Sequence, residues 1–189
     1  MNRFIRPQRS AADIHRAVAR RQATAEAVLA EAAETIEALE PHLHAWKCLA
    51  LPQALENARA LDRRIAEGRP CGLLAGVPLA VKDLIDTADL PTGYGSDLYE
   101  GHRPAADAEA VRLVRLADAV VVGKTVTTEF AYFTPGATAN PWHVGHTPGG
   151  SSSGSAAAVA SGMVPLAFGS QTAGSLIRPA SYRSEEPHV

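Results

Sequence analysis

The chain has 189 residues, of which 46% are hydrophobic and 20% are charged, the balance of an ordinary soluble globular protein. Its net charge of -2 gives no electrostatic reason to expect nucleic acid or an anionic membrane as a partner, and no apolar run reaches the ~18 residues of a membrane span. Cys48 and Cys71 lack the spacing of a metal site and are predicted to be buried thiols, as fits a reducing cytoplasm. We therefore predict one cytoplasmic domain that acts on a small molecule.

Three segments in the first part of the chain predict helices. Ser10 and Thr24 are favoured N-cap residues, and each precedes a segment with apolar residues at helical spacing. Pro52 opens a third such segment, and Gly68 closes it as a C-terminal stop would. The short apolar run 46–51 separates the second helix from the third.

A strand, a helix and a second strand are predicted next. The apolar run 73–81 is typical of a buried strand that delivers Lys82, and residues 105–116 alternate apolar and charged residues in helical fashion. Residues 119–122 are typical of a β-branched strand that ends at the triplet 123–125. Strands joined through a helix predict a parallel pair, and therefore an α/β fold.

The stretch 147–180 carries more Gly and Ser than ordinary packing requires. Residues 149–154 run into the Ala-rich segment 155–160, as a loop that enters a helix would. Residues 169–175 follow the apolar run 164–168 and precede an apolar pair, a pattern that predicts a strand, a tight loop and a helix start. Such a loop can direct several backbone N–H groups at one negative charge.

Several familiar catalytic motifs fail when their spacing is counted. The triplet 123–125 resembles the end of a P-loop, but Asp118 stands where that motif needs Gly. Residues 150–154 formally satisfy G-x-S-x-G with Ser152 at the centre, but no apolar strand precedes them. No Ser lies three positions before Lys82 or Lys124, as a penicillin-binding enzyme would need.

A lysine and serines in two Gly-rich loops remain, and this set can perform acyl transfer. His143 and His146 can in principle serve a Ser-His-Asp arrangement, but nothing around them distinguishes them from loop histidines. A desolvated Lys82 can accept a proton from a serine hydroxyl, directly or through a second hydroxyl. The equally open alternative is that Lys82 is structural and pairs with the adjacent Asp83.

Four segments taken together resemble the amidase signature family of serine hydrolases, which use a Ser-cis-Ser-Lys triad. They are residues 76–83, 123–125, 149–157 and 169–175. The resemblance implies a mixed β-sheet core flanked by helices, and an enzyme that needs no metal or organic cofactor.

By position, the resemblance also assigns the catalytic roles. Ser175 is the acylated nucleophile, Ser151 the bridging serine after a cis peptide bond, and Lys82 the base. The backbone of Thr172, Ala173, Gly174 and Ser175 forms the oxyanion hole. Lys82 must then be neutral when it acts, so Asp83 must point away from it.

The chain departs from the family pattern in two respects. Gln171 and Ala173 stand where many members have Asp and Gly, and Arg178 lies one position later than the usual Arg. The resemblance also covers only part of a family member. We expect residues 1–182 to be the N-terminal portion of a single amidase signature domain, with 183–189 an unrelated or frame-shifted tail. A sheet that ended there would expose unpaired edge groups. Such groups would favour pairing with a second copy, as a homodimer, or with a missing C-terminal half.

Three functions are compatible with these observations. The leading prediction is an amidase that hydrolyses the carbon–nitrogen bond of a small linear amide through an acyl-enzyme. A second is a protein like the A subunit of glutamyl-tRNA amidotransferase, although no basic patch supports it. A third is a catalytically inactive remnant that persists as an interaction module.

Overall fold

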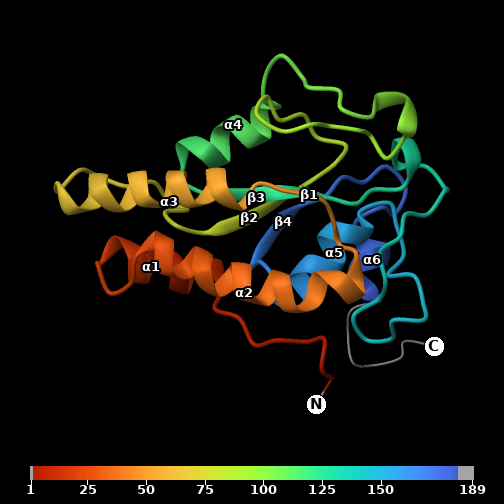
Figure 1. The fold of residues 1–189 in the computed structure, drawn as a ribbon, viewed down its shortest axis with the longest axis horizontal. Helices are drawn as coiled ribbons and strands as arrows, with labels where there is room; N and C mark the ends of the chain where they lie inside the picture. Colours follow the sequence, from red (N-terminus) through yellow and green to blue (C-terminus); the bar gives the residue numbers. More distant parts are fainter. Residues whose placement is uncertain (1, 183–189) are drawn as a thin grey trace.

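A mixed four-stranded sheet forms the centre of the chain in the computed structural model, which describes residues 2–182 (Figure 1). The strands are β1 (Trp46–Leu49), β2 (Pro78–Lys82), β3 (Val120–Thr125) and β4 (Leu166–Phe168). Their order is β1-β3-β2-β4, with β1 antiparallel to β3 and β2 parallel to both β3 and β4. The predicted α/β fold with a mixed sheet is confirmed, and the predicted parallel pair is β2 with β3, which α4 connects.

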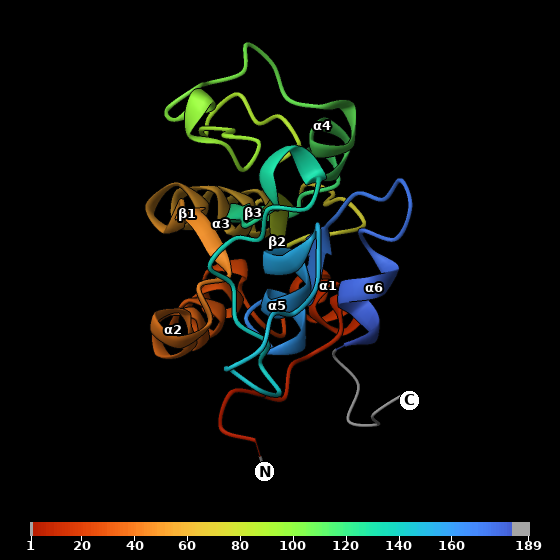
Figure 2. The ribbon, with the colours of Figure 1, turned by 90° about the vertical axis from the view of Figure 1, so that its right-hand side faces the viewer.

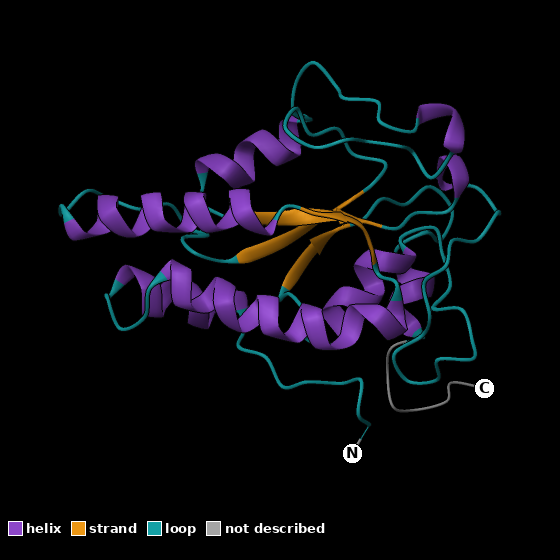
Figure 3. Ribbon diagram, viewed as in Figure 1, coloured by secondary structure: helices purple, strands orange, loops and turns teal. Residues whose placement is uncertain are grey.

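Helices cover both faces of this sheet (Figures 1 and 3). They are α1 (Ala11–Ala19), α2 (Ala25–Leu43), α3 (Leu51–Ala66), α4 (Glu109–Leu116), α5 (Ser153–Ala160) and α6 (Ile177–Ser181), with short 3₁₀ turns at Asp97–Tyr99 and Glu129–Ala131. In the view of Figure 1, α4 lies above the sheet and α1, α2 and α5 lie below it. Because both faces are covered, every residue of β2 and β3 is buried.

The predicted helix starts are confirmed by their caps. Ser10 Oγ accepts a hydrogen bond from Asp13 N–H, and Thr24 Oγ1 accepts one from Ala27 N–H. The third helix has Pro52 in its first turn, as predicted. The fourth begins at Glu109, four residues later than the sequence pattern indicated, so the preceding residues belong to the loop.

Two apolar clusters hold the layers together. The larger includes residues of α1, α2, α3 and α5, and the smaller contains Leu79 and Val81 of β2, Val121 of β3 and Val111 of α4. The prediction of buried thiols needs correction, because Cys48 and Cys71 are only half-buried; both are free. The predicted tail 183–189 lies outside the described residues.

Gly154 brings α5 against the sheet. Its N–H donates to Val126 O at 3.0 Å, and an added Cβ would lie 2.1 Å from Ala45 O. Only glycine allows this approach, which fixes the start of α5 beside the ends of β1 and β3. No described helix has the length and apolar content to cross a membrane.

Candidate active site

Two adjacent strands each bring a lysine to the same end of the sheet. Lys82 is the last residue of β2, and Lys124 on β3 pairs in register with Val81. Both lysine side chains are fully buried. A buried ammonium group is costly unless it is hydrogen-bonded or paired, so the partners of each lysine define its role.

Among the described residues, the side-chain amine of Lys82 has only hydroxyl partners. Its Nζ lies 2.6 Å from Ser151 Oγ and 2.8 Å from Ser170 Oγ. Within the described part of the chain, no carboxylate forms an ion pair with it. Burial lowers the pKa of Lys82 to about 8. The geometry therefore provides an amine that can be neutral near physiological pH and is in contact with the predicted bridging serine.

Ser151 is held just before the start of α5. The peptide bond between Gly150 and Ser151 is cis, and the Ser151 side chain is buried. Thr128 N–H donates to Ser151 O at 3.2 Å, and a Cβ on Gly150 would lie 2.8 Å from Thr128 Cγ2. The hydrogen bond from Thr128 holds the Ser151 backbone where its hydroxyl faces Lys82. A side chain at position 150 would collide with Thr128.

Ser175 lies beside this pair, in the second Gly-rich loop. Ser152 N–H donates to Ser175 O at 3.0 Å, which joins the two loops through the residue after Ser151. Between the described side chains, no hydrogen bond links Ser175 Oγ to Ser151 Oγ. The structure thus brings Lys82 and Ser151 into direct contact and places Ser175 in the adjacent loop, half-buried.

The turn before α6 keeps its backbone N–H groups available. Within residues 2–182, the N–H groups of Thr172, Ala173, Gly174 and Ser175 donate no hydrogen bond. The next two N–H groups, of Leu176 and Ile177, donate to Gln171 Oε1 at 3.1 and 2.9 Å. Gln171, a departure from the family pattern, therefore ties the beginning of α6 to the loop.

Two serines that the sequence analysis did not select belong to the same network. Ser170 contacts Lys82, and its backbone N–H and C=O each lie 3.2 Å from Ser152 Oγ, which accepts from one and donates to the other. Both residues stand within the Gly-rich loop motifs. Because the contact between Ser170 and Lys82 joins residues on different elements, only the folded chain reveals it.

Lys124 has a different environment. Its Nζ donates to Ile85 O at 2.9 Å and Thr92 Oγ1 at 2.6 Å, and forms an ion pair with Asp83 Oδ1 at 3.3 Å. Burial lowers the pKa of Lys124 and raises that of Asp83, and each opposes the shift of the other. Asp83 thus pairs with Lys124, and the alternative in which it pairs with Lys82 is wrong.

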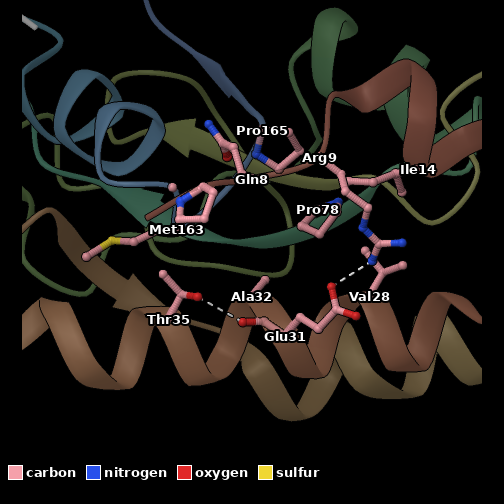
Figure 4. Close-up of a pocket in the computed structure, with 12 residues that line it drawn as sticks. Gln8, Arg9, Ile14, Val28, Glu31, Ala32, Thr35, Pro78, Met163 and Pro165 are labelled. Carbon is pink, nitrogen blue, oxygen red and sulfur yellow. Dashed lines mark hydrogen bonds and ion pairs between the residues drawn. The ribbon is translucent and has the colours of Figure 1, made fainter. Parts of the chain in front are cut away.

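Two cavities of about 340 Å³ lie in different parts of the molecule. One lies at the amino ends of β2 and β4, beside Pro78 and Pro165, with Arg9 and Glu31 paired at 2.7 Å across its rim (Figure 4). The other adjoins Gly149 and Gly150. Because the second borders the Ser151 loop and the first lies at the opposite end of β2 from Lys82, the second is the candidate substrate cavity. The residues from 2 to 182 form no cluster of three His, Cys, Asp or Glu side chains suited to a metal ion.

Comparison with known proteins finds that this chain is similar to amidases and to amidotransferase subunits. The family model described as Amidase matches residues 27–184. The A subunit of glutamyl-tRNA(Gln) amidotransferase from Nostoc punctiforme is 42% identical over 176 residues, which are 90% of this chain and 36% of the relative. The corresponding protein of Acidothermus cellulolyticus is 43% identical over 180 residues, 92% of this chain and again 36% of the relative.

Solved structures of similar proteins agree with this. The native peptide amidase from Stenotrophomonas maltophilia superposes with a TM-score of 0.87 at 37% identity, over 94% of this chain and 39% of that one. A bacterial aryl acylamidase of the amidase signature enzymes gives a TM-score of 0.83 at 34% identity, over 91% of this chain and 37% of that one. The chain therefore spans little more than a third of the length of the proteins it matches.

Proposed function

The chain belongs to the amidase signature family, and we propose that it carries the acyl-transfer site of an amidase that hydrolyses a small linear amide in the cytoplasm. Ser175 is the nucleophile, Ser151 the bridging hydroxyl and Lys82 the base. The observation that carries this proposal is the buried Lys82, 2.6 Å from Ser151 Oγ and without a carboxylate partner among the described residues. A lysine in these surroundings can be uncharged at the moment of proton transfer.

The proposed reaction proceeds in two half-reactions. Ser175 Oγ attacks the amide carbonyl carbon while its proton passes to Ser151 Oγ and the Ser151 proton passes to neutral Lys82. The oxyanion of the tetrahedral intermediate accepts hydrogen bonds from the N–H groups of residues 172–175, each worth on the order of 3 kcal/mol in the transition state. The carbon–nitrogen bond then breaks, and the leaving amine takes the proton from Lys82 through Ser151. Water then attacks the acyl carbon while its proton passes to neutral Lys82 through Ser151, and a proton returns to Ser175 Oγ as the ester bond breaks and the acid leaves.

The free N–H groups of the turn support the oxyanion role. Four consecutive donors that bond to nothing in the described chain, next to the proposed nucleophile, are what a developing negative charge requires. The chemistry uses only side-chain hydroxyls, an amine and the backbone, so the proposal includes no metal or organic cofactor.

A second candidate is transfer of an amide nitrogen within a larger assembly. It is favoured by the relatives named as glutamyl-tRNA(Gln) amidotransferase A subunits, which reach 43% identity to this chain. Formation of the same acyl-enzyme would then release ammonia toward an acceptor bound by partner subunits, and water would still hydrolyse the acyl-enzyme to release the acid. Ammonia release from simple amides by the purified chain, without partners, would favour the hydrolase over this alternative.

A fluorophosphonate probe that reacts with activated serines tests the shared site. We expect one covalent adduct, located at Ser175 by peptide mass spectrometry and absent in Ser175→Ala. A matched control is Ser181→Ala, an exposed serine on α6 whose loss leaves labelling unchanged. A chain that is folded by circular dichroism but takes up no probe would contradict the proposal and favour an inactive interaction module.

A further inference from the structure

Two histidine side chains of one surface loop point at each other. Nδ1 of His143 and Nδ1 of His146 lie 2.7 Å apart, and the ring centroids are 4.1 Å apart with an interplanar angle of 81°. Both residues are exposed, and neither takes part in the proposed acyl transfer. The two nitrogens therefore converge on one point that solvent can reach.

The backbone of this loop is held in place by its own hydrogen bonds. His143 N–H donates to Asn140 O at 3.0 Å, and His146 N–H donates to His143 O at 2.9 Å. Asn140 N–H in turn donates to His146 O at 2.9 Å. Residues 140–146 thus form two consecutive turns, which the third hydrogen bond closes into a ring.

Contacts with both ends of the described chain anchor the loop. Asn2 Nδ2 donates to Pro141 O at 2.9 Å, and Asn140 Nδ2 donates to Tyr182 O at 3.3 Å. In Figure 2 the loop belongs to the cyan segment between α5 and the N-terminal end. Because the backbone is already ordered, binding a ligand between the two rings costs little further conformational entropy.

The close approach of the two nitrogens suits a metal ion as well as a proton. When both imidazoles are neutral, the Nδ1–H of one ring donates to the bare Nδ1 of the other. A divalent ion can replace that shared proton, which then moves to Nε2 of the same ring, so that both rings bind the ion through Nδ1 as neutral ligands.

The rings need to move little to accept an ion. Metal–nitrogen bonds of about 2.0–2.1 Å place two nitrogens of a tetrahedral site roughly 3.3 Å apart, which is roughly 0.6 Å more than their present separation. Gly145 leaves room for this movement. A Cβ at that position would lie 3.4 Å from His143 Cε1 and 3.5 Å from His143 Nδ1.

The donor atoms select the kind of ion. Imidazole nitrogens favour divalent transition metals such as Zn²⁺ and Cu²⁺, whereas Mg²⁺ and Ca²⁺ prefer oxygen ligands. Within residues 2–182, no third His, Cys, Asp or Glu side chain completes a cluster with the pair. Water or a group from outside the protein would therefore fill the other positions around the ion, as in an open and exchangeable site.

We propose that His143 and His146 form a two-histidine binding site for Zn²⁺ or a divalent transition metal ion of similar chemistry. Thr147, the next residue, and Gly149 line the candidate substrate cavity, and Gly149 N–H donates to Thr147 Oγ1 at 3.2 Å. A bound ion would fix the segment that leads to Ser151 and would stabilise the folded chain. The ion has no part in the proposed acyl transfer, and the inference does not depend on it.

Titration calorimetry of the untagged chain with ZnCl₂ tests the site. We expect one Zn²⁺ per chain, and an affinity at least about tenfold lower in His143→Gln and in His146→Gln, because loss of even an outer-shell partner weakens a metal site by about 10–100-fold. Mg²⁺ should not compete. His102→Gln is the matched control, since His102 is an exposed histidine whose ring contacts only Tyr94 and Tyr99 among the described aromatic side chains; it should bind Zn²⁺ as wild type does.

Cu²⁺ provides a spectroscopic signature of the same pair. Its electron paramagnetic resonance spectrum should show coupling to two imidazole nitrogens in the wild-type chain and to fewer in either single variant, with circular dichroism confirming that each variant is folded. Ser175→Ala should bind both ions normally, so failure of the hydrolase proposal would leave this site intact. Unchanged Zn²⁺ affinity in His143→Gln and His146→Gln, or an equal loss in His102→Gln, would overturn the two-histidine site.

Discussion

Lys82 and Lys124 lie side by side on β2 and β3 and are equally buried, but their amines have different polar partners. Lys124 contacts a carboxylate, a carbonyl and a hydroxyl, which together can stabilise its ammonium form. Lys82 contacts two serine hydroxyls and no carboxylate among the described residues. Burial alone therefore does not define a catalytic lysine. The partners decide whether the buried amine remains a charged structural group or becomes a base.

Removal of Lys82 should have the largest effect on reactivity. We expect Lys82→Met to lower the rate of fluorophosphonate labelling by roughly 10²–10⁴-fold, because Ser175 would lose the base that accepts its proton. Thermal unfolding should occur at or above the wild-type temperature, because a fully buried amine is replaced by an apolar side chain of similar length. Near-normal labelling of a folded Lys82→Met chain would show that the base lies elsewhere.

Removal of Lys124 should instead affect stability. Lys124→Ala leaves the buried Asp83 carboxylate without its counter-charge and the carbonyl of Ile85 without its donor, a type of change that costs about 3–5 kcal/mol. Urea unfolding followed by circular dichroism measures the free energy of unfolding. Under conditions where the variant is folded, its labelling rate should stay near that of wild type. A catalytic loss as deep as that of Lys82→Met, without unfolding, would remove the distinction between the two lysines.

The sequence predicted this pair only in part. Local signals were sufficient for the caps at Ser10 and Thr24 and for the buried strand that ends at Lys82, because each depends on neighbouring residues. The partner of Asp83 could not be read from the sequence, because Lys124 lies on the adjacent strand and the register of β2 with β3 decides the pairing. Spacing alone left the role of Lys82 open, and the family resemblance was needed to assign it.

Ser170 illustrates what the sequence alone does not show. Ser170 is an ordinary member of a Gly-rich loop in the sequence, and its contact with Lys82 spans 88 positions. Only the fold, which brings the second Gly-rich loop beside the end of β2, shows that this hydroxyl contacts the lysine.

The pH dependence of labelling provides a smaller test of the same contrast. The pKa of Lys82 is lowered to about 8, so the neutral fraction of this amine rises about tenfold per pH unit below that value and levels above it. Labelling should follow this curve.

The stability of the fold should also depend on pH. Because the folded-state pKa of Lys82 lies below the ordinary lysine value of 10.5, the free energy of unfolding should increase as pH rises from about 8 toward 10.5, where the unfolded chain still binds the proton. Lys82→Met should lack both effects, and a flat labelling profile between about pH 6 and 9 would contradict the role of Lys82.

Ser170→Ala should produce the smallest change and still reveal which form of Lys82 the site stabilises. The variant removes one hydroxyl that accepts a hydrogen bond from Lys82 Nζ and retains the backbone position of residue 170 beside Ser152. Since that hydroxyl stabilises the charged amine, its loss should lower the pKa of Lys82 further and move the midpoint of the labelling curve to lower pH. The plateau rate should fall by about tenfold or less, because Lys82 loses one of the two contacts that orient it.

Ser161→Ala is the matched control, because Ser161 is a buried serine whose hydroxyl donates to Ala158 O. This variant should leave the midpoint unchanged. If the Ser170→Ala midpoint stays at the wild-type value, Ser170 contributes to packing and not to the state of the base, and the contrast with Lys124 rests on Ser151 alone.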